Sequence, residues 1–180
     1  MDMKMSSQMY VAINGKLEVA NYYNYNYGDS MVSRVRYGME YIMKCIDNPI
    51  MMHGEVFRRY LDIDFDKKSL NISLDVIYNH VSSYDVFDWD ANGGKVFISV
   101  DTSTKKIKYC FTDNDNRLLN VDQYLNWDLD VQNWRTWDID GWNDHTRNVC
   151  SGNTNRIKKL AKLMTQEELD AFLKLGGERA

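Results

Sequence analysis

Apolar residues recur at helical spacing in one long stretch near the N-terminus. From Val32 to Ile46 they follow one another every three or four residues, which places them on one face of an α-helix. Asp29 and Ser30 stand just before this stretch as good N-cap residues, and Asn48-Pro49 stops it. We therefore predict a long helix over residues 31–47, with its apolar face packed on a sheet.

The other face of this predicted helix is polar. It carries Arg34, Arg36, Glu40 and Lys44, and Arg36 lies one turn before Glu40. Opposite charges four residues apart stabilise an exposed helix face. We therefore expect this face to point away from the sheet.

Strand patterns lie on both sides of typical turn residues. Residues 9–13 and 16–20 flank Asn14-Gly15, the pair that a type I′ hairpin turn favours. The tyrosine- and asparagine-rich residues 21–28 follow as a loop or an edge strand. Farther along, segments 86–89, 95–100 and 106–112 predict a central meander of three antiparallel strands. A strand at 60–65 and a short helix near residues 74–81 lie between.

The C-terminal third predicts two helices after an irregular segment. Residues 113–152 show no sustained period, so we expect irregular structure held by aromatic side chains. Apolar residues at 157, 160, 161 and 164 then indicate one helix. Thr165 with Glu168 forms a capping box that opens a second helix, which ends at Gly176-Gly177.

These elements together predict one α+β domain over residues 1–180. Its antiparallel sheet combines the N-terminal hairpin with the central meander, and the helix at 31–47 packs on it. A helical pair at 154–176 completes the fold. We see no internal repeat and no linker that would divide the chain.

Composition narrows the class of protein. The 180 residues are 44% hydrophobic and 27% charged, which fits a globular domain and excludes collagen-like, coiled-coil and wholly disordered classes. No apolar run approaches the length that spans a membrane, and residues 1–8 are too polar for a secretory signal. Three scattered cysteines suit reduced thiols. We therefore expect a cytoplasmic protein that needs no membrane.

Charge is distributed unevenly along the chain, whose net charge is −4. Residues 113–144 hold eight aspartates against Arg117 and Arg135, a balance of −6, whereas residues 145–180 hold four acids against seven bases, a balance of +3. A protein that binds polyanions usually shows the opposite sign over most of its surface. The acidic block is therefore a local feature.

The acidic block also holds four of the five tryptophans. Its Asp-x-Asp pairs, which recur elsewhere in the chain, each present two carboxylates on one side of an extended segment, so together they resemble a phosphate backbone. Aromatic anchors ringed by polar groups are typical of protein interfaces. Two interpretations without a partner stay open: the aspartates are simply exposed to solvent, and the tryptophans are buried in the core. The residues predicted to meet a partner are Trp127, Asp128, Asp130, Trp134, Trp137, Asp138, Asp140 and Trp142.

One compact basic patch follows the acidic block. It comprises Arg156, Lys158, Lys159 and Lys162, and three interpretations stay open: contact with RNA phosphate, pairing with the acidic block, or plain solvation. A DNA-reading helix-turn-helix is disfavoured because acidic residues crowd the first turn of the second helix, where phosphate contacts would be made.

Candidate catalytic residues are few. Asp144, His145 and Arg147 are the nearest approach to the base, acid and cation that metal-independent RNA cleavage needs. No zinc-binding spacing, phosphate-binding glycine loop or nucleophile elbow is present, so we expect no metal and no cofactor.

The run Asp88-x-Asp90-x-Asn92-Gly93 matches half of a calcium loop, but Ser99 stands where the bidentate glutamate belongs, which favours a hairpin turn.

The chain as a whole resembles the type II-A anti-CRISPR proteins, small inhibitors of RNA-guided nucleases carried by phages and mobile elements. The resemblance covers the size and acidity of the domain, the aromatic segment 21–28 and the Asp- and Trp-rich stretch 127–142. It implies a host type II CRISPR nuclease as partner, alone or with its guide RNA, and therefore the host cytoplasm as location. We therefore expect a binding protein that presents an acidic, aromatic surface. The alternatives are an RNase or RNA-binding protein that truncates or sequesters guide RNA, and a phage protein with an unrelated partner.

Overall fold

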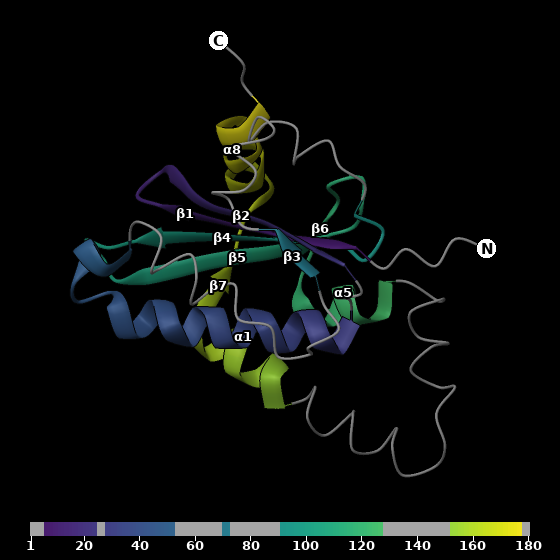
Figure 1. Cartoon of the computed structure of the whole chain (residues 1–180), viewed down its shortest axis with the longest axis horizontal. Coiled ribbons are helices and arrows are strands. Elements are labelled where there is room, and N and C mark those ends of the chain that lie inside the picture. Colours follow the sequence, from purple (N-terminus) through teal and green to yellow (C-terminus); the bar gives the residue numbers. More distant parts are fainter. Residues whose placement is uncertain (1–5, 25–27, 53–69, 73–90, 128–151, 178–180) are drawn as a thin grey trace.

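The chain begins with the hairpin that Asn14-Gly15 predicts. In the computed structural model, which describes residues 6–24, 28–52, 70–72, 91–127 and 152–177, strands β1 (Ser7–Ile13) and β2 (Lys16–Asn24) pair antiparallel around this turn (Figure 1). Asn14 and Gly15 take φ values of 52° and 81°, the left-handed conformations that a type I′ turn requires. The predicted hairpin is confirmed, and its strands extend beyond the predicted ends.

The hairpin joins a mixed sheet that has seven strands within the described residues. Its order is β3-β2-β1-β4-β5-β6, and β7 also pairs with β5. The bounds of the remaining strands are β3 (Leu70–Ile72), β4 (Lys95–Asp101), β5 (Lys106–Thr112), β6 (Leu118–Leu119) and β7 (Ala161–Leu163). Strands β4 and β5 pair antiparallel as predicted. The α+β class is therefore confirmed.

We predicted an antiparallel sheet, and this is wrong because two of the observed pairings are parallel. Strand β4 runs parallel to β1, and β7 runs parallel to β5. The hairpin turn fixes the direction of β2 alone, whereas β4 reaches the open edge of β1 only after a long connection that contains a helix. Parallel pairing needs such a crossover and no tight turn announces it.

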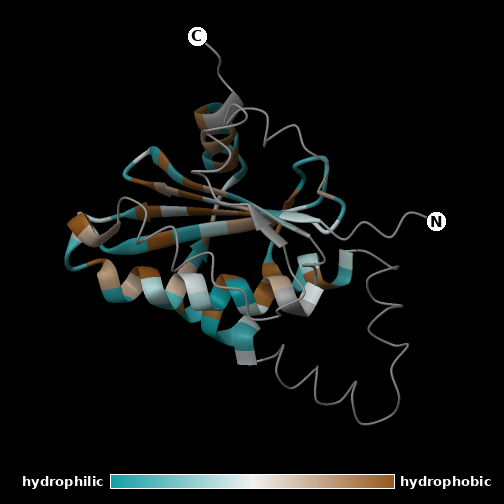
Figure 2. Ribbon diagram, viewed as in Figure 1, coloured by the Kyte–Doolittle hydropathy of each residue, from teal (hydrophilic) through white to brown (hydrophobic). Residues whose placement is uncertain are grey.

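Helix α1 (Gly28–Cys45) covers one face of the sheet (Figure 1). The helix predicted over residues 31–47 is confirmed, although it begins and ends slightly earlier. Its stripe of Val32, Val35, Met39 and Ile42 is fully buried in the main core cluster, together with side chains from β1, β4 and β5. Figure 2 shows the resulting alternation of apolar and polar positions along the helix.

Arg34 departs from the polar face on which we placed it. Its side chain is buried, and its guanidinium carbon lies 4.2 Å from the centre of the Tyr23 ring. A cation over an aromatic face gains from the ring quadrupole, and this gain offsets part of the cost of burial. Helical spacing alone did not reveal this contact because Tyr23 comes from β2.

Helix α8 (Gln166–Gly177) stands on the opposite face of the sheet. The rings of Phe172 and Phe97 form an edge-to-face pair with centres 5.2 Å apart, and Tyr10 stacks on Phe97 at 5.1 Å. The predicted capping box is present: the Thr165 N–H donates to Glu168 at 3.0 Å, and the Glu168 N–H donates to the Thr165 hydroxyl at 3.2 Å. The last predicted helix is therefore confirmed.

The C-terminal pair contains a strand that we did not predict. Residues 152–160 form a helix, but residues 161–163 leave it and become β7, which adds to the edge of β5. The prediction that one helix continues through Ala161 to Met164 is wrong. An open strand edge competes with the last helical turn for backbone hydrogen bonds, and sequence spacing does not register this competition.

The segment predicted to be irregular holds short regular elements before residue 128. Strand β6 pairs with β5, and helix α5 (Val121–Trp127) packs its buried Val121, Tyr124 and Leu125 against the α1 side of the core. Three apolar residues within one or two turns are too few to show a helical period. The predicted strands at 60–65 and 86–89 and the predicted helix near 74–81 lie outside the described residues.

Candidate functional site

Trp127 is the one described residue of the predicted acidic and aromatic interface. It is partly buried, and its ring lies 6.1 Å from that of Tyr124, to which it is nearly parallel. It also packs over the backbone of Gly94, where an added Cβ would lie 3.3 Å from the indole and 2.6 Å from Tyr124. Trp127 therefore contributes to the core on the α1 side.

The other residues of two predicted sites lie outside the described residues. They are Asp128, Asp130, Trp134, Trp137, Asp138, Asp140 and Trp142 of the interface, and Asp144, His145 and Arg147 of the proposed catalytic set. The two described elements that border this part of the chain are α5 and the helix at 152–160. An ion pair between Lys158 and Asp122 links these two helices.

The Asp-x-Asp pair at Asp113 and Asp115 does not form the two-carboxylate unit that we expected. Both residues lie in a turn, where the Asp113 carboxylate is nearly buried and accepts from the N–H groups of Asp115 and Arg117. It also pairs with the Arg117 side chain at 3.1 Å. Asp115 is exposed. A turn residue that accepts from neighbouring N–H groups has a structural role. Asp113 and Asp115 therefore do not present two carboxylates together to a partner.

The half calcium loop also has a structural role where it is described. The Asn92 side-chain oxygen accepts from the backbone N–H of Ser6 at 3.1 Å, and the N–H of Gly93 donates to the Ser6 carbonyl. Asn92 therefore binds the chain itself. Within the described ranges no group of three His, Cys, Asp or Glu side chains is placed to hold a metal ion.

The predicted basic patch is divided among several neighbours. Arg156 donates to Glu40 of α1 at 2.8 Å, and Lys158 pairs with Asp122 of α5. Lys159 is exposed on the same helix, whereas Lys162 lies on β7 in register with Lys108. The four cations therefore do not form one continuous face.

A different cationic group forms where α1 meets the helix at 152–160. Glu40 accepts from Arg156 at 2.8 Å and lies 3.5 Å from the Nε of Arg36. Arg36 also donates to the side-chain oxygen of Asn153 at 3.2 Å. Lys44 lies one turn further along α1. We name Arg36, Glu40, Lys44 and Arg156 the Glu40 cluster.

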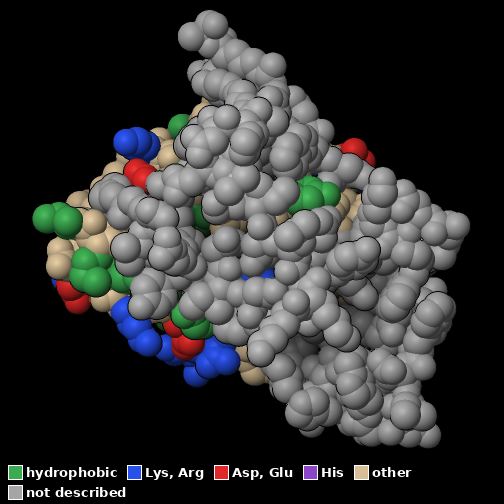
Figure 3. All heavy atoms as spheres, in the orientation of Figure 1, with side chains coloured by type: hydrophobic (Ala, Val, Ile, Leu, Met, Phe, Trp, Pro, Cys, Tyr) green, Lys and Arg blue, Asp and Glu red, His purple; other side chains and the backbone are tan. Residues whose placement is uncertain are grey.

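The electrostatics of this cluster follow from three cations around one carboxylate. The hydrogen bond from Arg156, with the charges of Arg36, Arg156 and Lys44, lowers the pKa of Glu40, although burial opposes the shift. Figure 3 shows Lys and Arg side chains gathered at the lower left of the molecule, with acidic atoms among them. Because Arg36, Lys44 and Arg156 are exposed, the cluster is a cationic region on the surface of an acidic protein.

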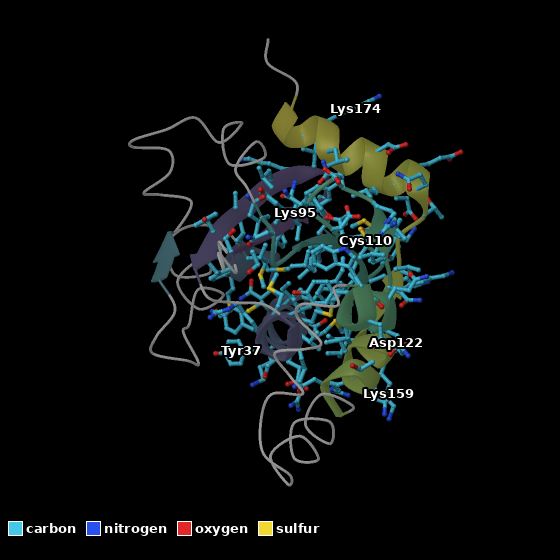
Figure 4. The ribbon with its side chains drawn as sticks, turned by 90° about the vertical axis from the view of Figure 1, so that its right-hand side faces the viewer. Tyr37, Lys95, Cys110, Asp122, Lys159 and Lys174 are labelled. Carbon is cyan, nitrogen blue, oxygen red and sulfur yellow. The ribbon has the colours of Figure 1, made fainter. Side chains whose placement is uncertain are left out.

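The opposite face of the sheet carries a row of polar side chains from adjacent strands. Tyr22, Gln8, Lys95 and Thr112 are register partners in β2, β1, β4 and β5. Gln8, Lys95 and Thr112 are buried, and the Lys95 ammonium donates to Asn116 at 2.9 Å. Figure 4 shows Lys95 and Cys110 beneath α8. Buried lysines need partners, and here an amide side chain supplies one.

Both of these polar assemblies depend on tertiary contacts that the sequence only partly signals. The spacing of Arg36 and Glu40 along the chain predicts their pairing, but Arg156 reaches Glu40 from a helix more than a hundred residues away.

No family model, no curated protein and no solved structure matches this chain. Among the described residues, no helix is both long and apolar enough to cross a lipid bilayer.

Proposed function

We propose that this protein is a stoichiometric inhibitor that binds a type II RNA-guided nuclease and competes with nucleic acid for a basic surface of that nuclease. The acidic, aromatic residues 128–142 supply the contact. The charge layout carries the proposal, because residues 128–144 hold five aspartates against Arg135, a balance of −4 within 17 residues. Three further tryptophans fall in the same stretch.

The contacts of the described part of the acidic block support this assignment. Asp113 and Asp122 are engaged within the chain, with Arg117 and Lys158. Trp127 packs over Gly94 and Tyr124. The N-terminal part of the block therefore serves the fold, and the proposal assigns binding to the aspartates and tryptophans from Asp128 onward.

Titration of DNA cleavage tests the proposal. Purified nuclease loaded with guide RNA is mixed with increasing amounts of this protein, and both DNA cleavage and guide length are followed on denaturing gels. We expect cleavage to fall to background near one inhibitor per nuclease, with the guide intact. Complex formation should weaken steeply with salt because it joins opposite charges.

A charge-reversal variant locates the contact. Replacing Asp128, Asp130, Asp138 and Asp140 by lysine should abolish inhibition. Reversal of the exposed Asp115 and Asp170, which changes the net charge by half as much, should leave inhibition within about twofold. Guide shortening at substoichiometric dose, lost in a His145→Ala variant, would favour the RNase alternative and overturn the proposal. Unchanged DNA cleavage at molar excess would overturn it as well.

A further inference from the structure

We propose that the Glu40 cluster, extended by Lys159, binds the phosphate backbone of single-stranded RNA. Arg36 and Arg156 hold one phosphate between them, and Lys159 contacts a neighbouring one. This inference does not depend on the nuclease, because it concerns contacts that the protein makes by itself.

The first argument is preorganisation of two guanidinium groups. Glu40 and Asn153 fix Arg36, and Glu40 fixes Arg156 through its Nε, at 2.8 Å. Both arginine side chains remain nearly half exposed, at 44% and 45%. Guanidinium groups bind phosphate through paired N–H donors, and groups already held in place lose little entropy when they bind.

The second argument is local charge. Arg36, Lys44, Arg156 and Lys159 supply four positive charges against the single negative charge of Glu40, a balance of +3 in a chain whose net charge is −4. Lys44 and Lys159 are exposed, and neither has an ion-pair partner among the described residues. One carboxylate cannot neutralise this surface, so it attracts a further anion.

The third argument separates nucleic acid from an acidic protein. The partly exposed Tyr37 follows Arg36 on α1, and Figure 4 shows Tyr37 and Lys159 on opposite sides of that helix. A strand bound at the cluster meets cations of α1 and of the helix at 152–160, with the partly exposed Tyr37 ring next to Arg36. Single-stranded nucleic acid is bound by this combination, since bases stack on rings and phosphates contact cations.

The two outer cations of α1 also give the surface a useful length. Arg36 and Lys44 are eight residues apart, which corresponds to about 12 Å along the helix axis. This length accommodates more than one phosphate of an extended strand. We therefore expect contacts with about three phosphates and a slope of about −2 in a plot of log affinity against log salt.

Fluorescence anisotropy with a short labelled RNA of mixed sequence tests the inference on the full chain alone. The double variant Arg36→Gln/Arg156→Gln should weaken binding about tenfold and flatten the salt slope. The matched control Lys16→Gln/Lys174→Gln changes the net charge equally at exposed sites on the hairpin and on α8. It should change affinity by less than about twofold.

Two single variants separate binding from folding. Lys159→Gln alters an exposed side chain and should weaken RNA binding about threefold, with an unchanged melting temperature. Glu40→Gln removes the competing negative charge but keeps a side-chain oxygen that can accept from Arg156, so the arginine stays oriented and binding should tighten. If the cluster only held the two helices together, Glu40→Gln would weaken that bridge, and RNA binding would become weaker instead of tighter.

Three results would overturn the inference. Equal losses in the Arg36/Arg156 double variant and in its Lys16/Lys174 control would show a response to net charge alone. Weaker binding after Glu40→Gln would exclude a phosphate beside this carboxylate. Binding of polyglutamate in place of RNA would assign the surface to an acidic protein. None of these results depends on the nuclease titration, so the two proposals fail separately.

Discussion

The two faces of the sheet are covered by helices that are attached in different ways. Helix α1 buries a long stripe of aliphatic and methionine side chains in a core that draws on most elements of the fold. Helix α8 covers a smaller cluster around Phe97, and the capping box and a pair between Lys108 and Glu168 position its first turn. The comparison indicates that the α1 face supplies most of the stability of the fold, and that α8 can detach while the core on the α1 side stays intact.

Each face contains one buried thiol that reports on its helix. Cys45 is 2% exposed at the end of α1, and Cys110 is fully buried beneath α8. Burial raises the pKa of Cys110 to about 12, so its thiol stays protonated at neutral pH and reacts slowly. Cys150 lies outside the described residues, and a Cys150→Ser background leaves these two thiols as the probes.

The largest effect is expected for Val35→Asp on the α1 face. Val35 is fully buried in the main core, and a carboxylate there would lie among apolar side chains, so the free energy of unfolding should fall by about 4 kcal/mol or more. Circular dichroism should show a loss of helix and strand content, and both Cys45 and Cys110 should react rapidly with a disulfide reagent. Ala171→Asp, at an exposed position of α8, is the control. A folded Val35→Asp variant with slow thiols would contradict the comparison.

Phe172→Ala should separate the two faces. The variant loses the edge contact with Phe97 and leaves a cavity under α8, which should cost about 3 kcal/mol. Because α1 keeps its own contacts, we expect Cys110 to react faster with a disulfide reagent while Cys45 stays protected. Equal exposure of both thiols at the same denaturant concentration would show that the faces unfold together.

Gly94→Ala should destabilise the end of the α1 face where α5 packs. A Cβ at residue 94 would lie 2.6 Å from Tyr124 and 3.0 Å from the Thr112 carbonyl, and its φ of 95° strains any other residue. We expect a loss of about 2 kcal/mol in urea unfolding. Gly152→Ala is the matched control, since nothing lies within 4 Å of the added carbon. Similar stability in the two variants would refute the close packing.

The smallest effect concerns pH and Glu168. The hydrogen bond from Lys108, together with the Thr165 N–H, lowers the pKa of Glu168 below its ordinary value. A lowered folded-state pKa adds stability above that ordinary value, and this contribution is lost as pH falls through the folded-state pKa. The melting temperature of the wild type should therefore exceed that of Glu168→Gln near neutral pH, and the difference should shrink toward about pH 4. A constant difference across this range would contradict the assignment.

Sequence patterns identified the elements whose signals are local. The Asn14-Gly15 turn, the stripe of α1 and the Thr165/Glu168 capping box all depend on residues a few positions apart, and the structure contains all three. The pairing of Arg36 with Glu40 belongs to the same class. Spacing along one helix is sufficient to predict such contacts.

The features that we missed depend on distant partners. The parallel pairing of β1 with β4, the strand at residues 161–163 and the burial of Arg34 against Tyr23 each join separate elements. The same holds for Trp127, which packs over Gly94, and for Arg156, which completes the Glu40 cluster. No short window of sequence contains both members of these contacts.

The central place of β1 has a consequence for synthesis of the chain. Strand β1 leaves the ribosome well before its parallel neighbour β4, since Gln8 pairs with Lys95. Contacts between such remote positions slow folding, since a large loop must close before they form. The nascent hairpin therefore exposes one edge of β1 until β4 has been synthesised.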